Sequence, residues 1–134
     1  MRHVETARFV RATPASVERA LDPASMLDWE GTFTVTGVEE DGDGALVEAY
    51  TAGMVAAFRF ERRDGEWRYA QDRGPFGSME TVVSWRAENE GTRVTAESSV
   101  TLGVPPRPIV DRVAAWKRRG ELRRLLAGLA DAVE

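Results

Sequence analysis

The sequence predicts an α+β fold in which a curved antiparallel sheet of seven strands wraps around one long C-terminal helix. Three observations predict it. Between Phe33 and Leu102, apolar and polar side chains alternate with the period of two that is typical of strands. Short turns rich in Gly and Asp separate these stretches, so consecutive strands should pair antiparallel. From Pro105 to Glu134 the apolar residues instead have the three-and-four spacing of a helix.

The N-terminal part of the chain supplies one more strand and two short helices. Residues 3–11 alternate loosely and are predicted to form the first strand. Thr13 suits the N-cap of a helix and Pro14 suits its first position, where the missing N–H costs nothing. Pro23 ends that helix, because the residue before a proline avoids the helical conformation, and starts a second one that runs to about Trp29.

Six further strands are predicted, and tight turns join most of them. The turn signals are 41–44, 64–65 and 89–91, and a loop is expected at 74–77. The strands cover residues 33–38, 45–51, 54–61, 67–71, 79–85 and 93–102. A sheet with one apolar face needs a cover, and the C-terminal helix is the only predicted element long enough to provide it.

That helix carries two apolar stripes that do not lie on one line. The first stripe consists of Ile109, Val110, Val113 and Trp116, and the second of Leu122, Leu125, Leu126, Leu129 and Val133. At about 100° per residue, the second stripe is rotated by more than a quarter turn from the first. The pattern favours a bend at Gly120 that lets both stripes face the sheet. The alternative is that one half faces the sheet and the other half faces a different surface, such as a partner.

Composition bounds the class of protein. A chain of 134 residues with 43% hydrophobic residues suits one domain spanning 1–134. There is no apolar run of about 18 residues and no charged-then-apolar leader, so we expect neither a membrane span nor a signal peptide. Cysteine is absent, which fits a cytoplasmic protein. His3 is the only histidine, so a catalytic triad or a histidine-ligated zinc site is not expected; the sequence predicts no metal and no cofactor.

Charge is unevenly distributed. The net charge is −4, but the segment 105–134 carries seven basic and four acidic residues, so the remainder is acidic. An acidic body argues against nucleic acid as a partner. We interpret the run 117–119, with Arg123 and Arg124, as a solvated helix face near the C-terminus. The alternative is contact with an acidic ligand head group or weak contact with a membrane surface.

Several phrases and their order resemble the START-like or helix-grip (SRPBCC) superfamily, of the polyketide cyclase/dehydrase and lipid-transport type. The matching phrases are Ala12-Thr13-Pro14-Ala15-Ser16-Val17, Leu21-Asp22-Pro23, Trp29, Gly74-Pro75-Phe76, Gly91-Thr92-Arg93-Val94-Thr95 and the proline-initiated terminal helix. The resemblance covers nearly the whole chain and implies a deep apolar cavity between sheet and helix. Members bind lipids, sterols, quinones, aromatic polyketides or hydrophobic hormones, and some are enzymes. They share no universal catalytic residue, so none is assigned here, and the lone His3 argues against the Rieske-type branch.

If this fold is adopted, a set of mostly aromatic side chains is predicted to line the cavity: Met26, Trp29, Phe33, Tyr50, Phe58, Trp67, Tyr69, Phe76, Met79, Trp85, Val113 and Trp116. Four tryptophans in so short a chain favour a ligand that packs against large rings. The alternative for each residue is that it simply fills the core. Polar groups on faces that could point inward are Tyr69, Gln71, Thr81 and Ser98. Four strand carboxylates are expected to face solvent: Glu48, Glu61, Asp72 and Glu80.

Three functions are compatible with these patterns. The first is a non-catalytic carrier or sensor of a small hydrophobic or aromatic molecule, such as a lipid, a polyketide or a quinone. The second is a polyketide cyclase or dehydratase, in which shaping of a reactive chain supplies most of the catalysis. The third is a protein-interaction module that uses the terminal helix. We expect a monomer or a homodimer.

Overall fold

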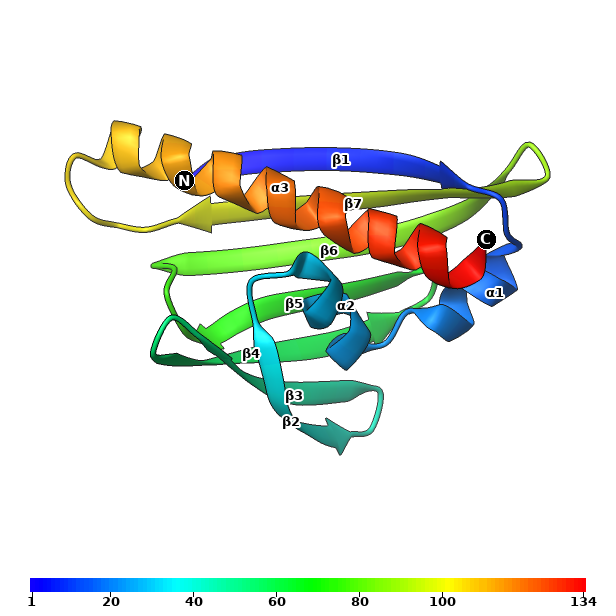
Figure 1. Ribbon diagram of the computed structural model, residues 1–134, viewed down its shortest axis with the longest axis horizontal. Coiled ribbons are helices and arrows are strands. Elements are labelled where there is room, and N and C mark those ends of the chain that lie inside the picture. The colour runs from blue at the N-terminus through cyan, green and yellow to red at the C-terminus, as the bar shows by residue number, and fades with distance from the viewer.

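The computed structural model describes residues 1–134 and confirms the predicted architecture (Figure 1). In chain order the elements are β1 (Arg2–Val10), α1 (Pro14–Ala20), α2 (Pro23–Glu30), β2 (Thr34–Asp41), β3 (Gly44–Thr51), β4 (Met54–Arg63), β5 (Glu66–Arg73), β6 (Ser78–Glu88), β7 (Gly91–Thr101) and α3 (Arg107–Val133). The seven strands form one antiparallel sheet in the order β1-β7-β6-β5-β4-β3-β2. Helix α3 lies across one face of this sheet, and α1 and α2 lie on the same side. No helix is both long and apolar enough to cross a membrane.

The two short helices begin as the sequence predicts. The Thr13 hydroxyl accepts a hydrogen bond from the Ser16 N–H, and the Asp22 carboxylate accepts one from the Ser25 N–H. Each helix has proline in its first turn. Gly31 ends α2 with a φ of 82°, a left-handed conformation that glycine adopts without a steric penalty. These caps fix the direction in which the chain leaves α2 toward the sheet.

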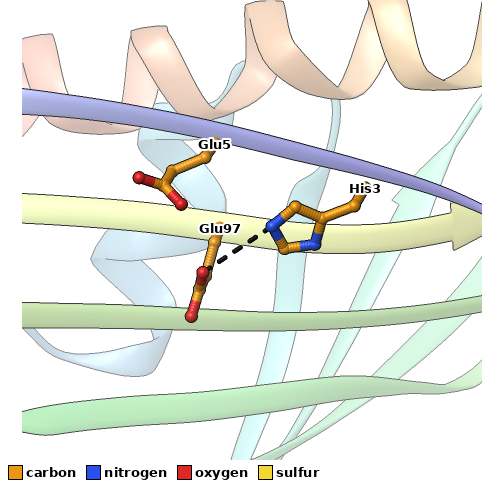
Figure 2. A group of neighbouring side chains, drawn as sticks. All are labelled: His3, Glu5 and Glu97. Carbon is orange, nitrogen blue, oxygen red and sulfur yellow. Dashed lines mark ion pairs between the residues drawn. The ribbon is translucent and has the colours of Figure 1, made fainter.

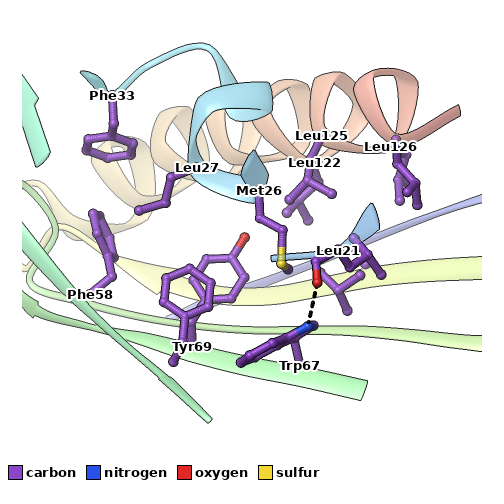
Figure 3. Close-up of a cluster of buried hydrophobic side chains, with 14 of the residues drawn as sticks. Leu21, Met26, Leu27, Phe33, Phe58, Trp67, Tyr69, Leu122, Leu125 and Leu126 are labelled. Atoms are coloured by element: carbon purple, nitrogen blue, oxygen red, sulfur yellow. Dashed lines mark hydrogen bonds between the residues drawn. The ribbon is translucent and has the colours of Figure 1, made fainter. Parts of the chain in front are cut away.

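The core lies between the inward face of the sheet and the C-terminal half of α3 (Figure 3). Aromatic rings pack there: Phe60 of β4 stacks on Tyr69 of β5 at 4.4 Å, and Phe33, just before β2, meets Phe58 of β4 edge-on at 4.9 Å. From the helical side, four leucines close the core: Leu122, Leu125, Leu126 and Leu129. Packed side chains therefore fill the space between the sheet and the C-terminal half of α3, and no cavity remains there.

Helix α3 is uninterrupted from Arg107 to Val133, so the predicted bend at Gly120 is wrong. Trp116 is 75% exposed, and Ile109 and Val113 also point to solvent. Because α3 is continuous, the side of the helix that carries the buried leucines also faces the sheet nearer the helix N-terminus. In that half, the buried residues on this side are Asp111, Ala114, Arg118 and Glu121. Ile109, Val113 and Trp116 of the first apolar stripe consequently lie outward, as the alternative interpretation allowed, while Val110 is partly buried.

Two glycines of α3 offer a matched test of this packing. A Cβ on Gly128 would lie 2.4 Å from Trp29 Cγ, whereas one on Gly120 would meet only Arg124 Nη1 at 3.5 Å. We expect Gly120→Ala to raise the free energy of unfolding by up to about 1 kcal/mol, because alanine is the better helix former. Gly128→Ala should lower it by about 1–3 kcal/mol, because the Trp29 ring must move. Urea denaturation measures both, and changes of the same sign would contradict this packing.

Candidate functional site

An apolar pocket of about 300 Å³ opens between the N-terminal half of α3 and one end of the sheet. Its walls come from the segment after α2, the β3–β4 turn, the β5–β6 loop, the end of β7 and α3. The lining residues are Thr32, Phe33, Thr51, Ala52, Met54, Pro75, Phe76, Leu102, Val113, Ala114, Lys117 and Glu121. Most of this lining is hydrophobic, which is typical of sites for small apolar molecules. A larger hollow of about 460 Å³ near Asp41 and Arg62 is lined mainly by charged residues and lacks this character.

Two sets of side-chain hydrogen bonds fix segments that form the walls of the pocket. The Gln71 amide donates to the Phe76 carbonyl at 2.8 Å and accepts from the Phe76 N–H at 3.0 Å, so it fixes the β5–β6 loop. On the other side, the Asp111 carboxylate accepts hydrogen bonds from the Leu102 N–H at 2.9 Å and from the Thr101 hydroxyl at 3.1 Å. These bonds lower the pKa of Asp111, the backbone bond most of all. The first turns of α3 are thereby tied to the end of β7.

One wall of the pocket is polar. The Lys117 ammonium lies 3.0 Å from a Glu121 carboxylate oxygen, and the Thr32 hydroxyl donates to the same oxygen. Lys117 is about half exposed, while Glu121 is buried. An ammonium, a hydroxyl and a carboxylate thus stand beside apolar walls, where they could orient a ligand that carries one polar group.

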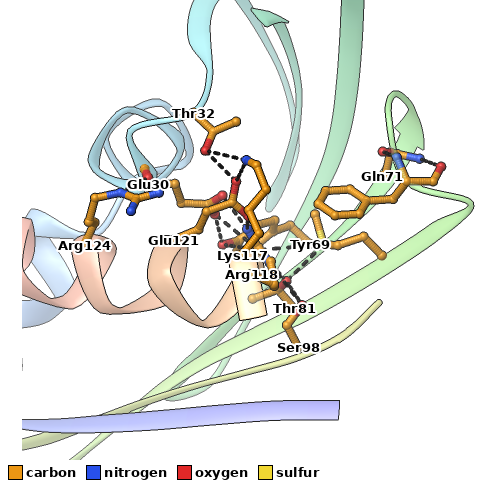
Figure 4. Close-up of polar contacts among 12 residues, drawn as sticks. Glu30, Thr32, Tyr69, Gln71, Thr81, Ser98, Lys117, Arg118, Glu121 and Arg124 are labelled. Carbon is orange, nitrogen blue, oxygen red and sulfur yellow. Dashed lines mark hydrogen bonds and ion pairs between the residues drawn. The ribbon is translucent and has the colours of Figure 1, made fainter. Parts of the chain in front are cut away.

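Behind this wall lies a buried charge network centred on Arg118 (Figure 4). Its guanidinium forms ion pairs with Glu30 at 2.5 Å and with Glu121 at 3.1 Å. It also donates to the Thr81 hydroxyl at 2.7 Å and to the Tyr69 and Ser98 hydroxyls at 3.2 Å. Arg118 is fully buried, and every buried polar side-chain atom of the chain has a hydrogen-bond partner. The network therefore meets the condition under which buried charge is tolerated.

The two carboxylates of this network have opposite pKa shifts. Burial raises the pKa of Glu30, and Arg118 offsets the increase only in part. Burial acts in the same direction on Glu121, but Arg118, Thr32 and Lys117 together hold the pKa of Glu121 below its usual value. Burial and the nearby Glu30 carboxylate raise the pKa of Tyr69, so its hydroxyl stays protonated and donates to Glu30. At neutral pH Glu121 is the ionised carboxylate that faces the pocket.

The predicted lining residues occupy three kinds of position. Phe33, Phe76 and Val113 line the pocket. Five others are buried in the core: Met26, Phe58, Trp67, Tyr69 and Met79. Trp29 and Trp85 are partly buried and pack against the core. Tyr50, at 49% exposed, and Trp116 lie at the surface and do not line the pocket.

The predictions for polar residues are correct in the strands and wrong in α3. Tyr69, Thr81 and Ser98, which were predicted to face inward, are buried. The four strand carboxylates expected to face solvent are exposed: Glu48, Glu61, Asp72 and Glu80. Arg118 was assigned to a solvated face, and that prediction is wrong. Lys117 was considered only as part of the basic run that could contact an acidic head group, and no site role was predicted for Glu121 or Glu30. One signal in the sequence could have identified the buried pair. Arg118 lies four residues before Leu122 and Glu121 four residues before Leu125, so both share the face of the leucine stripe.

A second polar cluster lies on the outer face of the sheet, away from α3. There His3 Nε2 lies 3.7 Å from a Glu97 oxygen, and Glu5 is adjacent (Figure 2). His3 Nδ1 is also 3.3 Å from the Ser99 hydroxyl. The His3 and Glu97 side chains are 57% and 43% exposed, so the contact has the character of a surface ion pair, which contributes little to stability.

Comparisons with known proteins identify the family and support the fold. A family model described as polyketide cyclase / dehydrase and lipid transport matches residues 1–134. A comparison with curated proteins finds no match. Among solved structures, TTHA0849 from Thermus thermophilus is similar, with a TM-score of 0.76, 21% identity and coverage of 98% of this chain and 96% of that one. A START superfamily protein from Mycobacterium smegmatis has a TM-score of 0.67 and 16% identity, with 98% and 96% covered.

A third similar structure is the di-domain ARO/CYC BexL from the BE-7585A biosynthetic pathway, with a TM-score of 0.75 and 17% identity. The match covers 99% of this chain and 50% of that one. At these identities the solved structures support the fold alone, whereas the family model matches the sequence from end to end. The chain therefore belongs to the polyketide cyclase/dehydrase and lipid transport family.

Proposed function

We propose that the protein is a non-catalytic carrier or sensor that binds one small hydrophobic or aromatic molecule in the pocket beside α3. The observation that carries the proposal is the apolar hollow of about 300 Å³ lined by Phe33, Phe76, Leu102 and Val113. Ligand sites commonly enclose about 300–1,000 Å³, so this pocket suits a compact ligand or one end of a longer one. The description of the family includes lipid transport, which supports a ligand of this class.

The polar wall gives the proposed ligand an orientation. A hydroxyl or carbonyl group placed beside Lys117 and Glu121 would keep its hydrogen bonds while the apolar part contacts Phe33 and Phe76. A ligand without any polar group would shield these side chains from water without offering them a hydrogen bond in return, which costs free energy. We therefore favour an amphipathic ligand with one polar end. The absence of cysteine supports a cytoplasmic location.

The second candidate is a cyclase or dehydratase, and one observation favours it. Glu121 is an ionised carboxylate on the pocket wall and could accept a proton from a bound substrate. BexL, whose description places it in a biosynthetic pathway, shares the fold. We rank this candidate second because Glu121 already accepts hydrogen bonds from Thr32 and Lys117 and pairs with Arg118, which weakens it as a base.

Native mass spectrometry of protein purified from its own host tests the proposal. We expect a fraction of the molecules to carry one small adduct, which organic extraction releases in an amphipathic form. Incubation of the extracted compound with fresh protein should return it unchanged. Conversion of the compound would instead favour the enzyme. Bare protein under gentle conditions, together with no binding of any added hydrophobic compound, would contradict both.

A further inference from the structure

Three large apolar side chains are exposed in a row along the outward face of the first half of α3. Ile109 is 63% exposed, Val113 57% and Trp116 75%, and their spacing of four and three residues puts them side by side. Monomeric proteins usually expose such residues singly, whereas a contiguous set marks an interaction surface. Helix packing does not explain this stripe, because Asp111 and Ala114 occupy the buried face of the same turns.

Positive charge surrounds this stripe. The exposed charged residues between positions 107 and 124 are all basic: Arg107, Arg112, Lys117, Arg119, Arg123 and Arg124. The two carboxylates of this segment, Asp111 and Glu121, are buried and have partners of their own. The segment is thus strongly cationic at its surface, although the chain as a whole has a net charge of −4.

A hollow of about 460 Å³ lies beside the stripe and is suited to an anionic group. It is lined by Trp116, Gly120 and four basic side chains, Lys117, Arg119, Arg123 and Arg124. Arginine and lysine side chains are the usual partners of phosphate oxygens. An exposed indole next to such a hollow is the arrangement that tryptophan adopts where apolar and charged layers meet.

The stripe is also continuous with the mouth of the apolar pocket. Val113 and Lys117 belong both to the outward face of α3 and to the pocket lining. Met54, from the β3–β4 turn, is 45% exposed and lines the same pocket. Anything that covers this face of α3 therefore lies against the entrance through which a ligand would pass.

We propose that this surface, defined by Ile109, Val113 and Trp116 with Arg112, Arg119 and Arg123, docks on an anionic lipid bilayer. Helices with an aromatic and aliphatic stripe flanked by basic residues lie in the plane of a membrane interface. A bilayer supplies both the apolar layer for the stripe and the phosphates for the arginines. This inference goes beyond the proposed function, and its test does not depend on what the pocket holds.

Co-sedimentation with vesicles tests the proposal. One set contains equal parts of phosphatidylcholine and phosphatidylglycerol, and the other contains phosphatidylcholine alone. We expect binding to the anionic vesicles, weakening as salt is added, and much weaker binding to the neutral ones. Arg119→Gln with Arg123→Gln should weaken binding by about twenty-five-fold, because each basic residue near an anionic surface contributes about fivefold. Trp116→Ala should weaken it as well.

The matched control is Arg59→Gln with Arg86→Gln, which removes the same charge from the outer face of the sheet and should leave binding unchanged. Sedimentation velocity is run on the same samples. Loss of vesicle binding in the control equal to that in the Arg119 and Arg123 variant would overturn the proposal. Failure of the wild-type protein to bind either kind of vesicle would also overturn the proposal. If that protein were a dimer that Trp116→Ala disrupts, the stripe would be a dimer interface instead.

Discussion

Arg118→Met is expected to lower the free energy of unfolding by about 3–5 kcal/mol, the cost of leaving buried charge without its partner. The guanidinium is fully buried and pairs with two buried carboxylates, Glu30 and Glu121. Methionine keeps an unbranched apolar stem, but it is shorter and supplies no charge and no donor. Both carboxylates would then lack their main counter-ion, and Glu30 has no other cation within ion-pair distance. Urea denaturation followed by circular dichroism measures the change.

The adjacent residue provides the control. Arg119 is exposed and makes no ion pair, so Arg119→Met should change the free energy of unfolding by no more than about 0.5 kcal/mol. Adding Glu30→Gln to Arg118→Met should restore part of the loss, because it removes one uncompensated buried carboxylate. Equal effects of the two methionine substitutions would mean that the network around Arg118 does not form.

Ala114→Phe is expected to weaken binding of the neutral probe N-phenylnaphthylamine by on the order of fifty-fold. Ala114 is buried on the α3 wall of the pocket, so a phenyl ring there occupies the space that a ligand would use. A ligand that buries about 100 Å² of apolar surface gains roughly 2.5 kcal/mol, which corresponds to this factor. Probe fluorescence during a protein titration gives the dissociation constants.

Ala132→Phe is the control for that substitution, because Ala132 lies on the same helix but is exposed and far from the pocket lining. It should bind the probe as the wild type does. Ala114→Phe could also disturb folding, so its unfolding midpoint is measured in parallel. A well-folded Ala114→Phe protein with unchanged probe affinity would mean that the probe binds elsewhere.

The fold was predictable because its signals are local. Thr13 and Asp22 cap helices through their own side chains, and the Asp64-Gly65 pair marks a tight turn. Period-two alternation follows directly from strand geometry, so strand positions needed no knowledge of distant partners. Which side of α3 faces the sheet was harder to predict, because the first half of the helix buries polar residues and exposes apolar ones.

The site was predictable only in part, because its character depends on contacts between distant segments. Phe33, Phe76 and Val113 were among the predicted lining residues, and they line the pocket. Arg118 could not be distinguished from Arg119 by composition, since both belong to one basic run. The ion pair between Arg118 and Glu30 joins residues 88 positions apart, and no local pattern marks it. The helical spacing places Arg118 on the buried side of α3 despite its charge. That burial is tolerated because Glu30, at the end of α2, supplies a buried counter-ion.

The central claim is that the pocket beside α3 binds a small hydrophobic molecule, and amide chemical-shift mapping tests it most directly. ¹⁵N-labelled protein is titrated with N-phenylnaphthylamine, and shift changes are assigned residue by residue. The account predicts the largest changes at Phe33, Phe76, Leu102 and Ala114, and none near Asp41 or Arg62 at the charged hollow. Shifts confined to the charged hollow, or spread evenly over the surface at saturating probe, would contradict it.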